Sequence, residues 1–537
     1  MAKPLRRPGS FKFDPILLVL LMAVVFLLLF RLDHRPFWQD EAETACLARN
    51  VLKYGVPQAF DGVNLISQEE GREFNGDYLW RWSPWLQVYL TAAAFRLGGL
   101  TTTAGRLPFA VLGIACVILV YFLVKRHFGD LVWARLAAAL LAFSVPFLLF
   151  SRQCRYYSMG AFLVLVSLYA FRQKWQSRWG PALLLAASLG LLFYTNYLIF
   201  FSYTTAFLLA AILFYRQEVL VPRSLVLLLI LGLMLVPGLA LYRIWEQTSM
   251  VEVLHVWISL PRYFGDLFQF VVPLPVAVAL IWRWRRPGIP RDPKEKFAIF
   301  LTLIISVNLC VIALIPSCEH RYLIHLYPLS VILLGWVVCQ VWRYQKFSGV
   351  LLGVMLIFTN WLHLVPLDWL RITNRPVHND FYMLTHPNIP LKLFLGELFS
   401  PYPDVNLSLI RFFQNCAQPG ETILVTYGDL PLQFYTSCKV IGGLQGRVLL
   451  GPEELPDWVV KRWYTRWNRD LNLISSEAFI REKLKLEKDY QMVVLPYEDE
   501  IFGNRADPYY HHFVPPVEPI NRIIVYRKRS KITSHVQ

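Results

Sequence analysis

Charged residues are scarce in this chain of 537 residues: Asp, Glu, Lys and Arg make up 17% of it, and 56% is hydrophobic. A soluble globular domain carries about 25% charged residues. The composition therefore excludes a large soluble core and indicates a polytopic membrane protein. The net charge is +16. Lys and Arg in cytoplasmic loops, close to anionic lipid headgroups, account for this excess, and we expect no nucleic-acid partner.

Several motifs of secreted proteins and soluble enzymes are also missing. The first apolar run, Pro15–Phe30, lacks the small-residue cleavage site of a signal peptide. The eight cysteines have no metal-ligand spacing. Cys416 and Cys438 share the C-terminal region, where they either form a disulfide or remain two free thiols. No glycine fingerprint for a nucleotide follows a predicted strand.

What the sequence does contain is about eleven apolar runs that match, or nearly match, a hydrocarbon core of ~30 Å. These runs are Pro15–Phe30, Ala104–Val124, Leu131–Phe150, Tyr157–Phe171, Pro181–Asn196, Tyr197–Phe214, Val221–Leu241, Phe264–Trp282, Phe297–Ile315, Tyr322–Trp342 and Val350–Val365. The run Trp85–Leu97 is shorter, follows Pro84 and carries Arg96. It predicts an interfacial helix rather than a span.

The distribution of basic residues predicts the orientation in the membrane. The N-terminal segment is basic and is expected in the cytoplasm. Basic residues recur in alternate loops, at Lys125–His127, Arg172–Arg178, Arg216, Arg283–Lys296 and Arg343–Lys346. With an odd number of spans, the C-terminal region then lies outside the cytoplasm.

Hydropathy falls after about Leu367, and three segments there resemble buried strands: Gly420–Tyr427, Tyr490–Leu495 and Arg522–Tyr526. The predicted fold class is an α-helical polytopic membrane protein with a C-terminal extracytoplasmic α/β domain. The expected domains are residues 1–366, with a first extracytoplasmic loop at 33–103, and residues 367–537.

Two adjacent acids, Asp40 and Glu41, follow the first apolar run and are framed by aromatic residues of interfacial type. Acids beside a bilayer are costly to keep for packing alone. Asp40-x-x-Glu43 also fits a capping box, with Asp40 as N-cap of a helix that ends at Gly55. Capping explains neither Glu41 nor the location, so we interpret the pair as catalytic as well.

Two further motifs lie on the same predicted face of the membrane. The segment Ser151–Tyr157 contains Arg155, and the segment Cys318–Pro328 contains Arg321 at the start of a span. An arginine near a helix N-terminus meets a phosphate with both its guanidinium fork and the helix dipole. The alternative for each arginine is snorkelling to lipid headgroups. Acids and arginines that converge on one face favour an anionic lipid substrate.

Taken in order, these motifs resemble one family. They are Phe37–Ala42, Ser83–Leu86, Gly105–Pro108, Arg152–Tyr157 and Arg321–Pro328. The set is similar to the GT-C glycosyltransferases that use polyprenyl-phosphate sugars, namely the protein O-mannosyltransferase and lipid A aminoarabinose transferase group. The resemblance covers about residues 37–365. The C-terminal domain resembles the extracytoplasmic domains of bacterial members only loosely.

The resemblance implies an inverting membrane glycosyltransferase that moves a sugar from a polyprenyl-phosphate carrier to a protein, lipid A or envelope-glycan acceptor. Its location would be the bacterial inner membrane, on the extracytoplasmic face. The catalytic pair would be Asp40 and Glu41, with a carboxylate taking the acceptor's proton. The substrate-binding residues would be Arg155, Tyr156, Arg321, His320 and Tyr322.

Metal dependence and two other classes of protein stay open at this point. Many relatives carry an acid in the motif before Arg155, where this chain has Gln153 and Cys154; this disfavours a divalent metal without excluding one. A lipid-linked sugar flippase would have polar residues deep in several spans, which are largely clean here. A non-catalytic scaffold would need no acid pair at the membrane. The sugar and the acceptor are not specified by the sequence.

Overall fold

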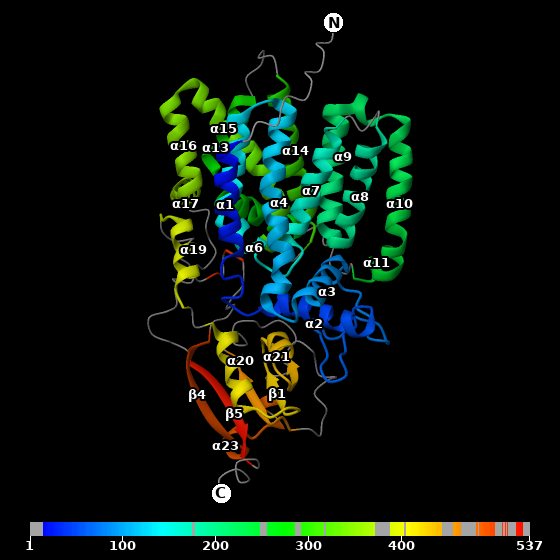
Figure 1. The fold of residues 1–537 in the computed structure, drawn as a ribbon, viewed down its shortest axis with the longest axis vertical. Helices are drawn as coiled ribbons and strands as arrows, with labels where there is room; N and C mark the ends of the chain where they lie inside the picture. The colour runs from blue at the N-terminus through cyan, green and yellow to red at the C-terminus, as the bar shows by residue number, and fades with distance from the viewer. Residues whose placement is uncertain are drawn as a thin grey trace.

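The computed structural model describes residues 14–529, except 174–177, 248–254, 285–291, 316–317, 371–386, 402–403, 443–454, 463–478, 482, 500–506, 509–510, 512 and 514–521. A helical bundle forms one end of the molecule and a small sheet domain forms the other (Figure 1). Helices α2 (Gln39–Tyr54) and α3 (Leu86–Gly98) lie between them. The candidate site is built at this junction.

The bundle consists of helices of different lengths, most of which are apolar. They are α1 (Pro15–Leu29), α4 (Thr102–Phe128), α5 (Leu131–Ala142), α6 (Val145–Ser151), α7 (Tyr157–Phe171), α8 (Trp179–Thr195), α9 (Tyr197–Val219), α10 (Pro222–Tyr242), α11 (Ile244–Gln247), α12 (Val256–Phe270), α13 (Leu274–Trp284), α14 (Pro293–Ile312), the 3-10 helix η2 (His320–Leu326), α15 (Tyr327–Tyr344), α16 (Lys346–Phe358), α17 (Trp361–Leu370) and α19 (Pro390–Phe399). Every predicted apolar run falls on one of these helices or on two consecutive ones.

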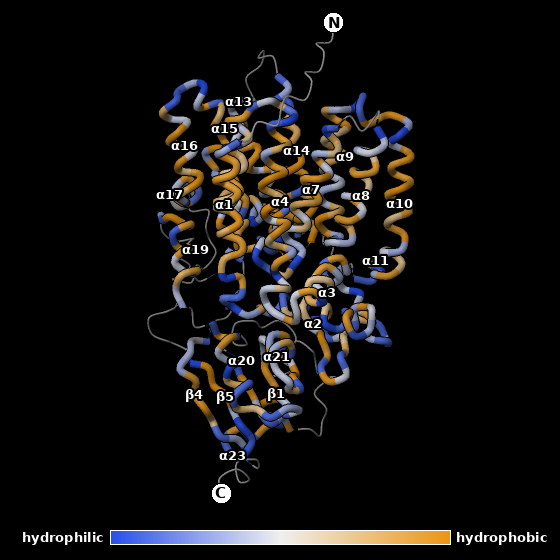
Figure 2. Tube along the Cα trace, viewed as in Figure 1, coloured by the Kyte–Doolittle hydropathy of each residue, from blue (hydrophilic) through white to orange (hydrophobic). Residues whose placement is uncertain are grey.

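Within the described residues, five helices are long and apolar enough to cross a membrane, or up to seven if each bent pair is one span. Four shorter apolar helices accompany them, among them α1 and α7. Figure 2 shows the apolar residues along these helices and polar residues toward the end near α2 and α3. The chain is an integral membrane protein, and the number of eleven spans stays a prediction.

The two bent pairs contain prolines where the helix is interrupted. Helix α5 turns into α6 by 63°, with Pro146 in the first turn of α6. Helix α12 turns into α13 by 102°, with Pro273 between them. Proline has no backbone N–H and restricts the residue before it, so a helix breaks at these positions. The first break brings residues 151–157 to the end of the bundle next to α2.

Helix α2 begins two residues earlier than its acid spacing suggested. Trp38 is its N-cap, and Glu41 at the third helical position accepts a hydrogen bond from the Trp38 backbone N–H at 3.5 Å. The prediction that Asp40 is the N-cap is therefore wrong. The predicted end is correct, because Gly55 closes the helix with φ of 79°, a left-handed conformation that glycine adopts without strain. The interfacial segment Trp85–Leu97 is helical, as α3.

The described part of the C-terminal domain contains a five-stranded sheet of order β2-β1-β3-β5-β4. Its strands are β1 (Thr422–Val425), β2 (Lys439–Gly442), β3 (Trp458–Lys461), β4 (Tyr490–Glu498) and β5 (Arg522–Lys528). Strand β1 pairs in parallel with β2 and β3, while β5 pairs antiparallel with β3 and β4. The helices are α20 (Val405–Cys416), α21 (Asp429–Tyr435) and α23 (Leu486–Asp489). Cys416 and Cys438 are both free thiols.

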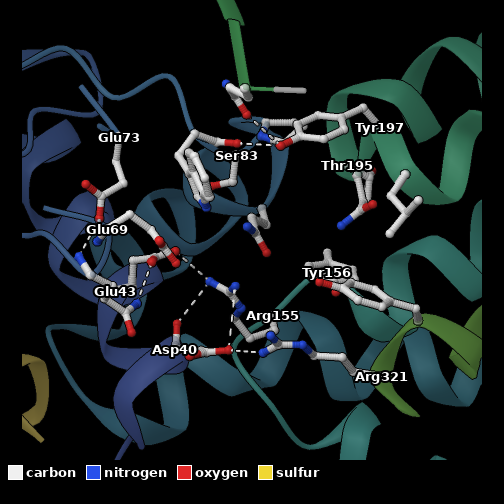
Figure 3. Close-up of a pocket in the computed structure, with 18 of the residues that line it drawn as sticks. Asp40, Glu43, Glu69, Glu73, Ser83, Arg155, Tyr156, Thr195, Tyr197 and Arg321 are labelled. Atoms are coloured by element: carbon white, nitrogen blue, oxygen red, sulfur yellow. Dashed lines mark hydrogen bonds and ion pairs between the residues drawn. The ribbon is translucent and has the colours of Figure 1, made fainter. Parts of the chain in front are cut away.

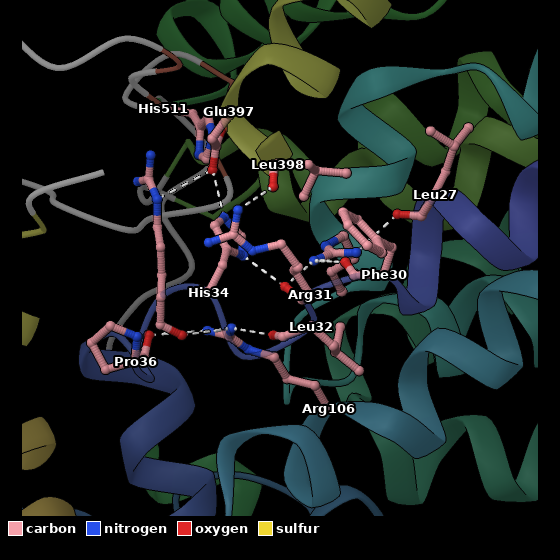
Figure 4. A network of polar contacts seen from close by, with 12 residues as sticks. Leu27, Phe30, Arg31, Leu32, His34, Pro36, Arg106, Glu397, Leu398 and His511 are labelled. Carbon is pink, nitrogen blue, oxygen red and sulfur yellow. Dashed lines mark hydrogen bonds and ion pairs between the residues drawn. The ribbon is translucent and has the colours of Figure 1, made fainter. Parts of the chain in front are cut away.

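Among the contacts that join the domain to the rest of the chain, two lie near the start of α2. Helix α21 packs on α2, where Gln39 Nε2 donates to Asp429 Oδ1 at 2.8 Å. The second contact is a buried network around Glu397 of α19, whose carboxylate meets His34, Arg35 and His511 at 2.9, 3.2 and 2.6 Å (Figure 4). Both contacts hold the segment that leads from α1 into α2.

Candidate active site

A cavity of about 290 Å³ opens where α2 meets the bundle. Its walls come from the first turn of α2, the loop between α2 and α3, the α6–α7 connection, the α8–α9 connection and the start of η2. Five of the residues predicted from the sequence line it together: Asp40, Arg155, Tyr156, Arg321 and Tyr322. Glu41 and His320 do not line it.

Asp40 lies between two guanidinium groups. Arg321 Nη1 donates to Asp40 Oδ2, and Arg155 Nη2 lies 4.0 Å from the same oxygen. The three side chains are 15%, 21% and 10% exposed. Figure 3 shows Arg321 and Arg155 meeting at the Asp40 carboxylate. Both guanidinium groups are largely shielded from bulk water, so an incoming phosphate would form strong charge-assisted hydrogen bonds with them.

Arg155 is held by the first turns of α2. Its Nη1 atom donates to the Asp40 carbonyl oxygen at 3.1 Å, to Glu43 Oε1 at 2.8 Å and to Thr44 Oγ1 at 3.1 Å. The guanidinium carbon of Arg155 also lies 5.7 Å from the ring centre of Tyr156. These contacts fix the direction of the guanidinium before any ligand arrives, which is the condition for strong electrostatic stabilisation.

Glu41 points away from the cavity into a fully buried network. Its carboxylate accepts from Arg106 Nε at 2.8 Å, from Arg106 Nη2 at 2.6 Å and from the backbone N–H of Cys154 at 2.7 Å. Arg106 also donates to the carbonyl oxygens of Leu32, Arg35 and Pro36. Glu41 thus ties α2 to α4 and to the α6–α7 connection.

His320 is also packed inside the protein. Its Nε2 atom lies 2.9 Å from the Tyr327 hydroxyl, and its ring contacts Phe270 at 4.8 Å between centres. Its side chain is 0% exposed. His320 therefore lies in the core beside the site, where it supports η2, and not on the cavity wall.

Gln153 and Cys154, which precede Arg155, face α2 instead of the cavity. Trp38 Nε1 donates to Gln153 Oε1 at 2.6 Å, and the Cys154 N–H donates to Glu41. Because both residues hydrogen-bond to the start of α2, the motif around Arg155 positions the helix that carries Asp40.

Three further acids complete the cavity. Glu43 was expected only as part of a capping box, and the sequence did not single out Glu69 and Glu73. Glu73 is 1% exposed and accepts from the backbone N–H groups of Gln68 and Glu69 and, at 3.0 Å, from the Ser67 hydroxyl. Gln68 Nε2 in turn donates to Glu43 Oε2 at 2.7 Å. Glu73 thus shapes the Ser67–Glu73 turn. The high density of acids in this segment is the sequence feature that could have pointed to Glu69 and Glu73.

Aromatic side chains form the opposite wall. Trp82, Tyr156, Tyr197 and Tyr322 line the cavity, and the Tyr197 hydroxyl donates to the Trp82 carbonyl oxygen at 2.9 Å or bonds Gln247 Oε1 at 2.8 Å. Flat aromatic faces beside carboxylates suit a sugar ring, which has apolar C–H faces and hydroxyl edges. Among the residues that the structure describes, no group of three or more His, Cys, Asp or Glu has a geometry that could hold a metal ion.

Comparisons with known proteins found a similar family model and a similar fold. Residues 83–242 match the family model described as dolichyl-phosphate-mannose-protein mannosyltransferase. The fold is similar to that of ArnT from Cupriavidus metallidurans bound to undecaprenyl phosphate: the TM-score is 0.55, the identity is 14%, and the alignment covers 96% of this chain and 98% of ArnT. The apo state of ArnT gives a TM-score of 0.57 at 14% identity, covering 95% and 97%.

The search of curated proteins gives no match. Part of the chain thus matches a mannosyltransferase family model, and the whole chain shares the fold of ArnT. The predicted fold class, a helical membrane bundle of GT-C type followed by a small sheet domain, is confirmed.

Proposed function

We propose that this protein is a membrane glycosyltransferase that moves a sugar from a polyprenyl-phosphate carrier to a hydroxyl or amine of an acceptor. The observation that carries this proposal is the arginine pair, Arg155 and Arg321, which meet at Asp40 on the wall of the cavity. The match of residues 83–242 to a mannosyltransferase family that uses a lipid-phosphate donor supports it. So does the shared fold with ArnT, which binds undecaprenyl phosphate.

The proposed reaction is a single displacement. The acceptor oxygen attacks the anomeric carbon from one face, and the bond from that carbon to the phosphate oxygen breaks on the other, so the anomeric centre is inverted. The phosphate gains charge as it leaves, beside Arg155 and Arg321, which stabilise it. The two guanidiniums thus supply positive charge where a divalent cation would otherwise act, and we propose no metal for this step.

A carboxylate of the cavity takes the acceptor's proton. The sequence singles out Asp40 for this role. In the structure, Asp40 is already engaged in an ion pair with Arg321, which taking up a proton would disrupt. Glu41 is committed to Arg106 and Cys154, and we place it among the residues that position α2.

We further propose that the site faces the extracytoplasmic side of a bacterial inner membrane, with the acceptor a protein, a lipid or an envelope glycan. The alternation of basic loops supports this orientation. The purified protein in lipid nanodiscs should transfer labelled sugar from a polyprenyl-phosphate donor to extracted envelope material, with release of polyprenyl phosphate. If no donor in a panel of neutral and amino sugars gives either product, while liposomes show donor translocation, a transporter replaces the enzyme.

A further inference from the structure

The cavity holds four carboxylates, and three of them are engaged in fixed contacts. Asp40 pairs with Arg321, and Glu43 accepts from Arg155 and Gln68. Glu73 accepts from the turn that it closes. Of these four carboxylates, that of Glu69 alone makes no hydrogen bond or ion pair with the described residues, although Glu69 lines the same cavity.

Glu69 nevertheless lies on a turn that hydrogen bonds hold in place. Its backbone N–H donates to Glu73 Oε1 at 2.7 Å, and the N–H of Gly71, which has φ of 81°, donates to the Ser67 hydroxyl at 2.9 Å. Gln68, the residue before Glu69, donates a hydrogen bond to Glu43, and Glu43 accepts another from Arg155. The turn is therefore tied to the phosphate-binding arginine. Figure 3 shows Glu69 on the acidic side of the cavity, across from Tyr156.

We propose that Glu69, rather than Asp40, is the general base of the transfer. This rests on the proposed function. In the step, the acceptor's O–H proton moves to a Glu69 carboxylate oxygen as the acceptor oxygen bonds to the anomeric carbon. The bond between that carbon and the phosphate oxygen breaks, and its electron pair leaves with the polyprenyl phosphate beside Arg155 and Arg321. No oxidant, reductant or second co-reactant is needed.

The electrostatic surroundings suit this role. Burial raises the pKa of Glu69 to about 7, and the nearby carboxylates of Glu73 and Glu43 add to the rise, while Arg72 opposes it. Glu70 also faces this carboxylate, from the same turn. A base with a pKa near the working pH is the most effective proton acceptor, because it is largely ionised and still binds the proton well. Asp40, Glu43 and the two arginines are the other charged groups around the cavity.

The test is the pH dependence of transfer in the full-length protein, with Glu69→Gln, Glu69→Asp and Glu70→Gln as variants. Glu70 is exposed and one residue away, so Glu70→Gln makes the same chemical change outside the cavity. We expect wild-type kcat to rise through about pH 7. Glu69→Gln should lower kcat by about 10²–10⁴-fold and abolish the rise, with donor KM and thermal stability little changed. Glu69→Asp should recover part of the rate, and Glu70→Gln should keep the wild-type rate, with a rise at slightly lower pH because the charge of Glu70 is removed.

The possible failures can be told apart. Transfer by Glu69→Gln within about threefold of wild type, or a wild-type kcat that is flat between pH 5.5 and 8.5, would overturn the assignment of Glu69 while leaving the proposed function intact. The wild-type profile needs no variant, so the assignment can be tested even if a substitution impairs folding. A wild-type protein that transfers no sugar would remove the proposed function, and the base with it.

Discussion

At the scale of single residues, Asp40 and Glu41 are neighbours on one helix but have different surroundings and different roles. Consecutive helical residues point about 100° apart, so Asp40 reaches the cavity and Glu41 reaches the core. The sequence showed an acid pair at a membrane edge but could not tell which acid faces which side, because that depends on Arg106, a residue 65 positions away. Glu69 escaped notice for a related reason: its loop has only isolated bridges, such as Gln58 with Leu79, and no periodic pattern.

The different surroundings of the two acids predict opposite phenotypes. Asp40→Asn should leave α2 intact, since Trp38 is its N-cap, and should release Arg321, which raises the donor KM at least about tenfold. Glu41→Gln leaves the buried Arg106 without its charge partner, a loss of about 3–5 kcal/mol in the free energy of unfolding. Thermal melting of both variants beside donor kinetics checks this. A stable Glu41→Gln variant, or an unstable Asp40→Asn variant, would contradict the assignment.

At the scale of secondary-structure elements, hydropathy located the membrane helices well, because an apolar run must be helical in a bilayer. The strands were found unevenly. β1, β4 and β5 were expected, whereas β2 and β3 were not. β1, β2 and β3 have four residues each, but β2 and β3 each include a lysine, and no longer apolar run marks them. Contacts between elements were not predictable either. The packing of α21 on α2 depends on surfaces that are almost 390 residues apart in the chain, as Gln39 and Asp429 are.

The Asp429–Gln39 contact predicts a pH effect on stability. Asp429 is fully buried, and desolvation raises its pKa from 3.8 to about 6, although the hydrogen bond from Gln39 lowers it. A carboxyl with a raised pKa in the folded state binds its proton more tightly than in the unfolded state. Stability from this group is therefore greatest at low pH and falls as pH rises from about 4 to 6. The cost at neutral pH is on the order of 1–3 kcal/mol.

Asp429→Asn keeps the acceptor for Gln39 and removes the buried charge. We expect the melting temperature of the variant to exceed that of wild type at pH 7.5 and to match it near pH 4.5, where both side chains are neutral. Thermal melting of the full-length protein at the two pH values measures the difference. A variant that is less stable than wild type at both values would show that the Asp429 carboxylate stabilises the α2–α21 contact.

At the scale of the whole molecule, the fold brings one face of the bundle, the α2–α3 loop and the sheet domain together at a single junction (Figure 1). Arg155 and Arg321 are far apart in the chain, and their convergence on Asp40 follows the prediction that all three lie on one membrane face. The sequence could not show that the sheet domain supports α2 from behind through α21, because no local pattern records a contact between domains.

The predicted orientation can be tested with reporter fusions. A fusion of alkaline phosphatase after Val405 should be active, and a reporter that folds only in the cytoplasm should be dark at the same position, since an odd number of spans places this point outside. A fusion of the same reporters at Phe128, the last residue of α4 at its predicted cytoplasmic end, should give the opposite pattern and serves as the matched control. Phosphatase that is silent after Val405 and active at Phe128 would invert the topology and the proposed side of the reaction.

The central claim is that the arginines at Asp40 receive the phosphate of a polyprenyl-phosphate sugar. The most direct measurement is the rate of polyprenyl-phosphate release against donor concentration for wild type, Arg321→Lys and Arg321→Ala in nanodiscs. Lysine keeps the charge and loses the two-pronged guanidinium geometry. The account predicts a graded loss of kcat/KM: about tenfold for Arg321→Lys and about 100-fold or more for Arg321→Ala, with normal melting. Unchanged kinetics in both variants would contradict the account.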